Sequence, residues 1–187
     1  IQSARMQVYF IDNEDYFQRK HTLQDENGEF FSDNDERAIF FARGVLETVK
    51  KLRWSPDIVH CLGWFTSLVP LYLKHSYNED PLFANSKVVY SIYNDEFDKP
   101  WKNGIKDKLK FEGINNKAIK KIKDNPNYVN LIKMVIDNSD AIIKGSEKIN
   151  QEVEEYLENT NKLVLDYQPQ DKYIESYSKF YDELLTK

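Results

Sequence analysis

The sequence predicts an α/β protein in which a parallel sheet carries helices on both faces. Short apolar segments typical of strands alternate with amphipathic segments typical of helices along most of the chain. No Asn-Gly or Asp-Gly turn joins two strand segments into a hairpin, so we expect helices to connect the strands. At 187 residues the chain fits one domain, which we place at residues 1–187.

The chain begins with a predicted strand and a long predicted helix. A β-branched and aromatic run predicts a buried strand at residues 7–11, which Asp12-Asn13 ends. Apolar residues at three- and four-residue steps predict a helix from about 34 to 52 with one buried face. Asp33 is the candidate N-cap of this helix, because it precedes the apolar pattern and an acidic residue follows three positions later.

Two further strands are predicted at residues 57–60 and 87–92, where apolar runs follow turn-forming residues. The helix between them begins near Phe65. Pro70 should kink this helix unless the helix starts later in the chain, since proline lacks the amide proton that an interior position needs.

The second half of the chain opens with an irregular, asparagine-rich stretch, predicted as an insertion at about 94–126 with one or two short helices. The same α/β alternation then resumes and ends in an amphipathic helix. The predicted elements are a helix at 127–138, a strand at 141–144, a helix at 146–158, a strand at 162–165 and the terminal helix at about 170–185.

Composition and charge exclude several partners. A net charge of −5 and a pI of about 5.3 argue against general binding to nucleic acid or anionic membranes. No apolar run reaches the ~20 residues that a membrane-spanning helix needs. The single cysteine, Cys61, rules out an internal disulfide and suits a reducing cytoplasm. We therefore expect a cytoplasmic protein that binds neither nucleic acid nor membrane.

Polar and aromatic residues follow the predicted strands at the positions where open α/β sheets bind ligands. They lie at 12–13, 60–64, 93–95, 145–146 and 166–167. This mixture suits a carbohydrate or a nucleotide sugar, because sugars are held by side-chain hydrogen bonds and by a ring against an apolar sugar face. Turn formation and capping are the alternative reading, since the same residue types often follow strands.

The motifs of other catalytic classes are missing. The sequence has no glycine-rich phosphate loop, no helical His-Glu metal pair, no two-cysteine metal knuckle and no serine elbow. His60 and Cys61 are adjacent on a predicted strand, so their side chains should point to opposite faces rather than form a nucleophile pair. We predict a buried structural cysteine, no metal and no cofactor, and assign no catalytic residue.

Residues 57–64, Asp-Ile-Val-His-Cys-Leu-Gly-Trp, resemble the motif "pDvvHaHDWqt" of bacterial glycogen synthases and plant starch synthases. Further segments resemble the same family in the same order and together cover most of residues 6 to 155. The sequence also resembles the short synthase-like proteins of Bacteroidetes. These segments are 8–13 ("vYliDnp"), 31–37 ("yxDNaeRf"), 88–94 ("vxTiHN") and 131–146 ("flKaGixyaDxvttVSp").

The resemblance implies the N-terminal, acceptor-side half of a GT-B glycosyltransferase, which is built from two Rossmann-like domains with the active cleft between them. Such enzymes transfer glucose from ADP-glucose or UDP-glucose to an α-1,4-glucan with retention and without a metal. On this reading one cleft is lined by Asn13, Asn34, His60, Trp64, Tyr93 and Asn94. For Asn34 and Trp64, helix capping and core packing are the alternative roles.

The sequence also departs from the family pattern at positions that matter for catalysis. The second histidine and the aspartate of the family's "HAHDW" are Leu62 and Gly63 here, and the histidine of "TiHN" is Tyr93. The family's Lys-Thr-Gly-Gly donor loop and its second Rossmann domain have no counterpart in these 187 residues. We therefore expect no independent glucosyl transfer.

Three functions remain open at this point. The chain is half of a glucan synthase completed by a separate donor-binding domain or by a homo-oligomer, or it is a non-catalytic glucan-binding or regulatory module. The third alternative is a Rossmann-like domain with an unrelated small ligand.

Overall fold

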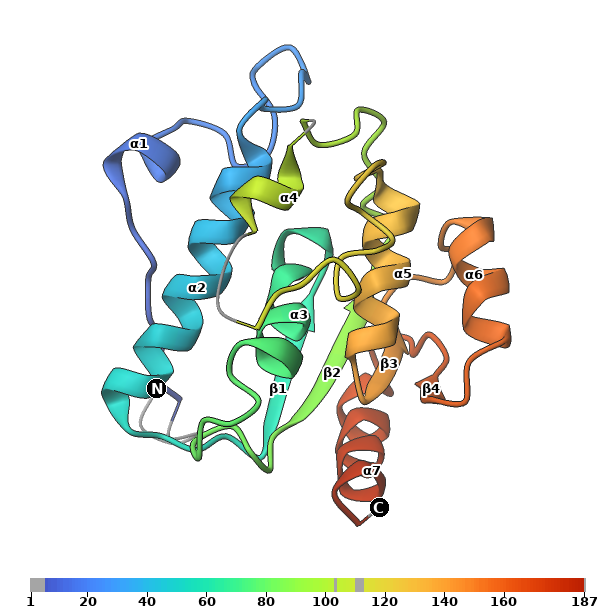
Figure 1. Ribbon diagram of the computed structural model, residues 1–187. Coiled ribbons are helices and arrows are strands. Elements are labelled where there is room, and N and C mark those ends of the chain that lie inside the picture. Colours follow the sequence, from blue (N-terminus) through green and yellow to red (C-terminus); the bar gives the residue numbers. More distant parts are fainter. Residues whose placement is uncertain (1–5, 103, 110–112, 187) are drawn as a thin grey trace.

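The computed structural model describes residues 6–102, 104–109 and 113–186, and its centre is a four-stranded parallel sheet (Figure 1). All neighbouring strands are parallel, and their spatial order follows the chain. The strands are β1 (Ile58–Leu62), β2 (Lys87–Ile92), β3 (Ala141–Lys144) and β4 (Leu163–Leu165). The predicted α/β class with a parallel sheet is confirmed.

Helices precede the first strand, lie between the strands and follow the last one, as the alternating pattern predicts. They are α1 (Glu14–Phe17), α2 (Asn34–Leu52), the 3-10 turn η2 (Trp64–Thr66), α3 (Leu68–His75), α4 (Ile105–Lys108), α5 (Tyr128–Asn138), α6 (Gln151–Glu158) and α7 (Tyr173–Thr186). Pro70 is the third residue of α3, where its missing amide proton breaks no helical hydrogen bond. The helix therefore starts later than Phe65, as the proline requires.

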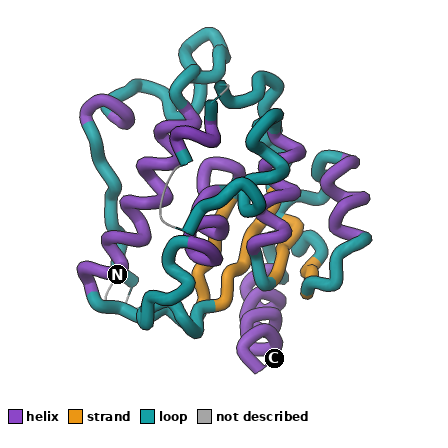
Figure 2. The backbone as a smooth tube through the Cα atoms, viewed as in Figure 1, coloured by secondary structure: helices purple, strands orange, loops and turns teal. Residues whose placement is uncertain are grey.

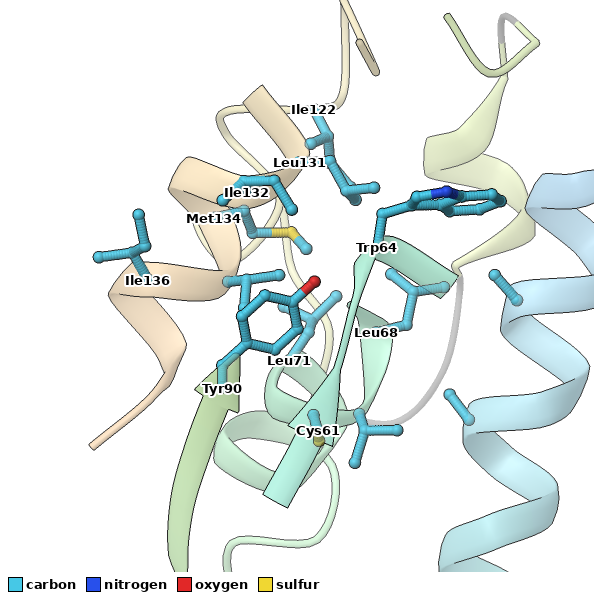
Figure 3. Close-up of a cluster of buried hydrophobic side chains, with 14 of the residues drawn as sticks. Cys61, Trp64, Leu68, Leu71, Tyr90, Ile122, Leu131, Ile132, Met134 and Ile136 are labelled. Carbon is cyan, nitrogen blue, oxygen red and sulfur yellow. The ribbon is translucent and has the colours of Figure 1, made fainter. Parts of the chain in front are cut away.

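The two faces of the sheet have separate apolar cores. On β2, Val88, Tyr90 and Ile92 point into the larger core, which also contains residues from α2, α3, α5 and α6. Figure 3 shows Tyr90 in this core together with Leu71 of α3 and Met134 of α5. Val89 points to the opposite face, where Phe180 and Leu184 of α7 cover it. This alternation confirms that the side chains of Cys61 and His60 face opposite sides, with Cys61 buried in the larger core.

The prediction of a strand at residues 7–11 is wrong. This segment has no regular secondary structure and runs beside α2 in the opposite direction, with Ile11 against Gly44 (Figures 1 and 2). Val8 is 66% exposed and Phe10 is 88% exposed. A strand needs a neighbouring strand to pair its backbone and cover its side chains, and within the described residues this segment has no such neighbour.

Smaller differences concern the ends of elements. β1 extends two residues beyond the predicted 57–60, and the helix predicted at 146–158 begins only at Gln151, where the Asn150 side chain accepts the Val153 amide proton. The predicted insertion is irregular with the one-turn α4 in it, while residues 103 and 110–112 lie outside the described residues.

Candidate functional site

A pocket lies at the carboxyl ends of β1 and β2, where ligands bind in open α/β sheets. Its volume is about 350 Å³, which falls within the range of small-molecule sites. Three segments form it: the loop before α2, the start of η2 and the loop after β2. The lining residues are Leu23, Gln24, Gly28, Glu29, Phe30, Trp64, Asp95, Glu96, Phe97, Asp98 and Lys99.

Three aromatic rings form the apolar wall of the pocket. The ring of Phe30 lies 5.0 Å from that of Phe97 in a nearly parallel arrangement and 5.2 Å from that of Trp64. Trp64 and Phe97 are buried, whereas Phe30 is only half-buried. Phe30 is thus the ring that is open to a ligand, and the other two fix its position.

Asp95 places a carboxylate beside these rings. Its Oδ2 accepts the Trp64 amide proton at 2.9 Å, and its Oδ1 lies 3.3 Å from the Tyr128 hydroxyl. Burial raises the pKa of Asp95 above its ordinary value, although the hydrogen bonds from Trp64 and Tyr128 act in the opposite direction. The fold therefore holds a carboxylate in a partly desolvated place, which costs free energy.

More carboxylates stand on the rim of the pocket. Glu29 pairs with Lys99, and both oxygens of Glu96 accept hydrogen bonds from the Asn150 side chain at 2.9 and 3.0 Å. Asp98 is exposed beside them. Acceptor oxygens around an aromatic wall match a ligand with many hydroxyl donors and apolar ring faces.

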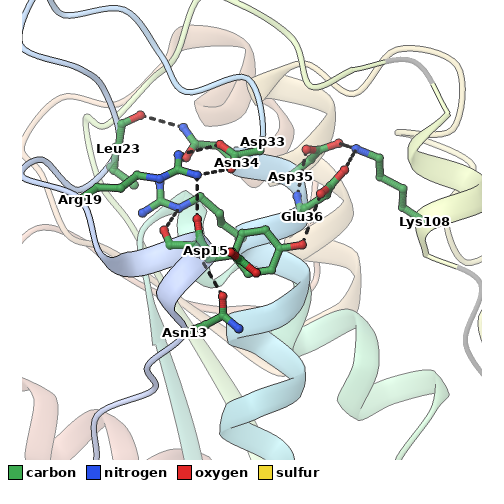
Figure 4. Close-up of polar contacts among 11 residues, drawn as sticks. Asn13, Asp15, Arg19, Leu23, Asp33, Asn34, Asp35, Glu36 and Lys108 are labelled. Carbon is green, nitrogen blue, oxygen red and sulfur yellow. Dashed lines mark hydrogen bonds and ion pairs between the residues drawn. The ribbon is translucent and has the colours of Figure 1, made fainter.

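The polar network at the start of α2 holds one wall of this pocket (Figure 4). Asn34 is buried, its side-chain amide donates to the Leu23 carbonyl at 2.7 Å, and its side-chain oxygen accepts from Arg37. The bond to Leu23 fixes the loop that leads to Phe30. Asp33 precedes α2 as predicted, but its carboxylate binds Arg19 and makes no capping bond.

Asn13 and Asn94 are two of the five predicted site residues that lie outside the pocket lining. The Asn13 side chain caps α1 by accepting the Tyr16 amide proton at 3.0 Å. Asn94 is exposed in the loop after β2, where its backbone N–H donates to the Ser146 hydroxyl at 3.0 Å. Of the six residues proposed from the sequence, Trp64 is the one in the pocket lining. A binding role for all six stays a prediction.

His60 lies on the other face of the sheet, beneath α7. Its Nε2 is 2.7 Å from the Ser91 hydroxyl and its Nδ1 is 2.7 Å from the Tyr181 hydroxyl. Burial lowers the pKa of His60 to about 4, so the ring is neutral at pH 7. The structure thus separates His60 from Trp64.

Tyr93 packs its ring against Gly145, where a Cβ would lie 2.7 Å from the tyrosine Cε1.

Sequence reasoning missed Phe30 and Phe97, because both lie in irregular loops where no periodicity marks a buried face. Asp95 stood among the strand-end positions but not among the six chosen residues. The sequence signal that could have pointed to Asp95 is the Gly-Trp pair directly after β1. The Trp64 amide proton lies at the start of η2, so it needs an acceptor from another part of the chain, and Asp95 provides it.

Other classes of site find no support in the part of the chain that the structure describes. No three side chains of the His, Cys, Asp or Glu type gather in a way that would hold a metal ion. Burial raises the pKa of the Cys61 thiol to about 12, which leaves it inert as a nucleophile. None of the described helices is both long enough and apolar enough to span a bilayer.

Comparison with known proteins decides the family. The sequence matches the starch synthase catalytic domain family over residues 1–164. The chain belongs to this family. Among individual proteins, it is 43% identical to the glycogen synthase of Chlorobium limicola over 93 residues, which are 49% of this chain and 19% of that protein. It is 46% identical to the glycogen synthase of Vibrio parahaemolyticus over 90 residues, 48% of this chain and 18% of that one.

The fold also matches a solved relative. The catalytic domain of starch synthase IV from Arabidopsis thaliana, determined bound to ADP and acarbose, aligns with a TM-score of 0.57 at 20% identity. The alignment covers 78% of this chain and 32% of that one. The chain therefore has the fold of part of a starch synthase catalytic domain, and it spans about a fifth of the length of the curated relatives it matches.

Proposed function

We propose that these 187 residues bind an α-1,4-glucan in the pocket at the ends of β1 and β2, and that they do not transfer glucose by themselves. The observation that carries the proposal is the combination of a half-buried aromatic ring, Phe30, with an anchored carboxylate, Asp95, at the ligand edge of a starch synthase family fold. The relative solved with ADP and acarbose supports a nucleotide and a carbohydrate as the ligand classes of the family.

The chemistry of the pocket suits a glucosyl unit. The C–H face of a glucose ring packs against Phe30, while carboxylate oxygens of Asp95 and its neighbours accept protons from the hydroxyls around the ring. The pocket is acidic, with four carboxylates and one lysine in its lining. A neutral sugar tolerates that charge better than the diphosphate of a nucleotide sugar does, which favours the acceptor over the donor.

The proposal that the chain does not transfer glucose by itself is supported by three motif positions. Transfer needs hydrogen-bond donors or cations placed where charge develops on the donor sugar and diphosphate. Leu62 is 51% exposed and apolar, Gly63 has no side chain, and the Tyr93 ring packs against Gly145. Leu62 and Gly63 offer no side-chain donor or cation, and Tyr93 has a phenol hydroxyl where the family motif has an imidazole.

Titration calorimetry with maltoheptaose tests the proposal. We expect saturable binding to the wild-type chain and about fivefold weaker binding to Phe30→Ala, since an aromatic contact contributes about 1 kcal/mol. Tyr173→Ala, which removes a ring that is 41% exposed on α7, is the control and should bind like the wild type. Absence of binding to the wild-type chain would contradict glucan recognition.

A second assay separates binding from catalysis. Incubation of the chain with ADP-glucose and glycogen should release no ADP above the background of the two reagents alone. Release that depends on the chain would show that it is an enzyme by itself. Release that appears only when a separate donor-binding domain is added would assign it to half of an assembled synthase.

A further inference from the structure

Gly63 and Asp95 compete for the same space. Gly63 has a φ of +69°, and a Cβ built on it would lie only 2.5 Å from Oδ2 of Asp95, far inside van der Waals contact. A residue with a side chain at position 63 and the present carboxylate of Asp95 therefore exclude each other. The two residues lie 32 positions apart in the sequence, at the ends of the neighbouring strands β1 and β2.

Position 63 is also the place where the related synthase motif "HAHDW" has its aspartate, with Trp64 in register as the tryptophan. This chain lacks that side chain, but Oδ2 of Asp95, in the loop after β2, lies 2.5 Å from the place where a Cβ of residue 63 would be. The amide proton of the adjacent Trp64 holds this carboxylate at 2.9 Å. A carboxylate from the loop after β2 therefore lies beside position 63, where Gly63 itself carries no side chain.

We propose that Asp95 supplies, from the loop after β2, the carboxylate that the motif places at position 63, and that this carboxylate binds sugar hydroxyls in the pocket. The inference rests on the proposed glucan binding and names the residue that determines it. Each carboxylate oxygen has two lone pairs, so both oxygens can accept a ligand proton in addition to their present partners.

A purely structural role explains Asp95 less well. Anchoring the Trp64 amide proton needs one acceptor oxygen, which a neutral asparagine would provide as well. The Tyr128 hydroxyl, the other partner of Asp95, also has the Tyr93 carbonyl at 3.0 Å as an acceptor. The carboxylate instead carries a charge into a partly desolvated pocket, and burial raises its pKa. A charged acceptor that is fixed by the backbone is what recognition of hydroxyl donors requires, because its hydrogen bonds are stronger than those of a neutral one.

The variant Asp95→Asn tests the role in binding. It keeps the shape and one acceptor for Trp64 but removes the charge. We expect a melting temperature at pH 7 equal to or above that of the wild type, and maltoheptaose affinity reduced at least about tenfold, as for the loss of hydrogen bonds to a charged group. Asp124→Asn, which neutralises a carboxylate that is 83% exposed, is the control and should change neither.

Each outcome has one meaning. Normal sugar affinity in Asp95→Asn with a binding wild type overturns this inference and leaves glucan binding intact. Loss of affinity together with a large drop in melting temperature assigns Asp95 to folding alone and also overturns it. If the wild-type chain does not bind maltoheptaose, the proposed function and this inference fall together.

A double-mutant cycle, read out as melting temperature, tests whether a side chain at position 63 and the carboxylate of Asp95 compete for the same space. Gly63→Asp alone should lower the melting temperature strongly, because two carboxylates and a strained backbone meet at one point. In the background of Asp95→Gly the same substitution should cost clearly less, since the space is then free. An equal cost in both backgrounds would show that the two positions do not compete and would overturn the exchange.

Discussion

Replacing Lys108 with methionine should lower the free energy of unfolding by about 3 kcal/mol, the cost of leaving a buried carboxylate without its partner. The side chain of Asp35 is only 1% exposed, and its ion pair with the Lys108 ammonium joins α2 to α4 (Figure 4). The same ammonium lies 2.8 Å from Glu36. Methionine keeps the length of the side chain but removes the charge that compensates Asp35.

Urea unfolding at pH 7 measures this effect. Lys106→Met is the matched control, because Lys106 lies on the same short helix and is exposed. The control should change the free energy of unfolding by less than about 0.5 kcal/mol, as surface substitutions usually do. Adding Asp35→Asn to Lys108→Met should recover part of the loss. Equal free energies for the Lys108 and Lys106 variants would show that the buried pair does not hold the insertion to α2.

Acidification from pH 7 to pH 5 should destabilise the protein through His60. Its pKa is lowered to about 4 in the folded chain, whereas the unfolded chain takes up the proton near its ordinary value of 6.5. The stabilisation by the neutral ring is therefore complete above pH 6.5 and is lost as the pH falls toward 4. Complete loss would amount to roughly 3 kcal/mol, from about 1.4 kcal/mol for each pH unit.

The variant His60→Gln isolates this contribution. It retains polar atoms for Ser91 and Tyr181 but has no titrating ring, so the slope of unfolding free energy between pH 6.5 and 5 should largely disappear. Asp33 and Glu36 add little there, since Arg19 holds the pKa of Asp33 below its ordinary value, as Lys108 does for Glu36. Burial raises the pKa of Asp95, which acts in the opposite direction to His60. The exposed His21, replaced by glutamine, is the control. A slope unchanged in His60→Gln would contradict the burial of a neutral histidine beneath α7.

Local sequence patterns predicted the elements whose burial is encoded in their own periodicity. The apolar steps of α2 and α5 and the apolar run of β2 gave their positions to within about two residues. The run at residues 7–11 carries an equally apolar pattern and yet forms no strand. A strand depends on a partner that lies elsewhere in the chain, and local sequence does not reveal whether that partner is present.

The candidate site was predictable only in part for a similar reason. The rule that ligands bind at the ends of parallel strands led to Trp64 and to the loop that contains Asp95. It did not reveal that His60 faces away from Trp64, nor that α7 covers His60. Phe30 reaches the pocket through an irregular loop held by Asn34, a contact that only the folded chain displays.

The most direct test of glucan recognition is an NMR titration of the isotopically labelled chain with maltoheptaose. The amide signals of Phe30, Trp64 and Asp95 should shift in a saturable manner, while those of His60 and Tyr181 on the opposite face stay in place. Shifts confined to the face beneath α7, or no shifts at millimolar maltoheptaose, would contradict a glucan site at the ends of β1 and β2.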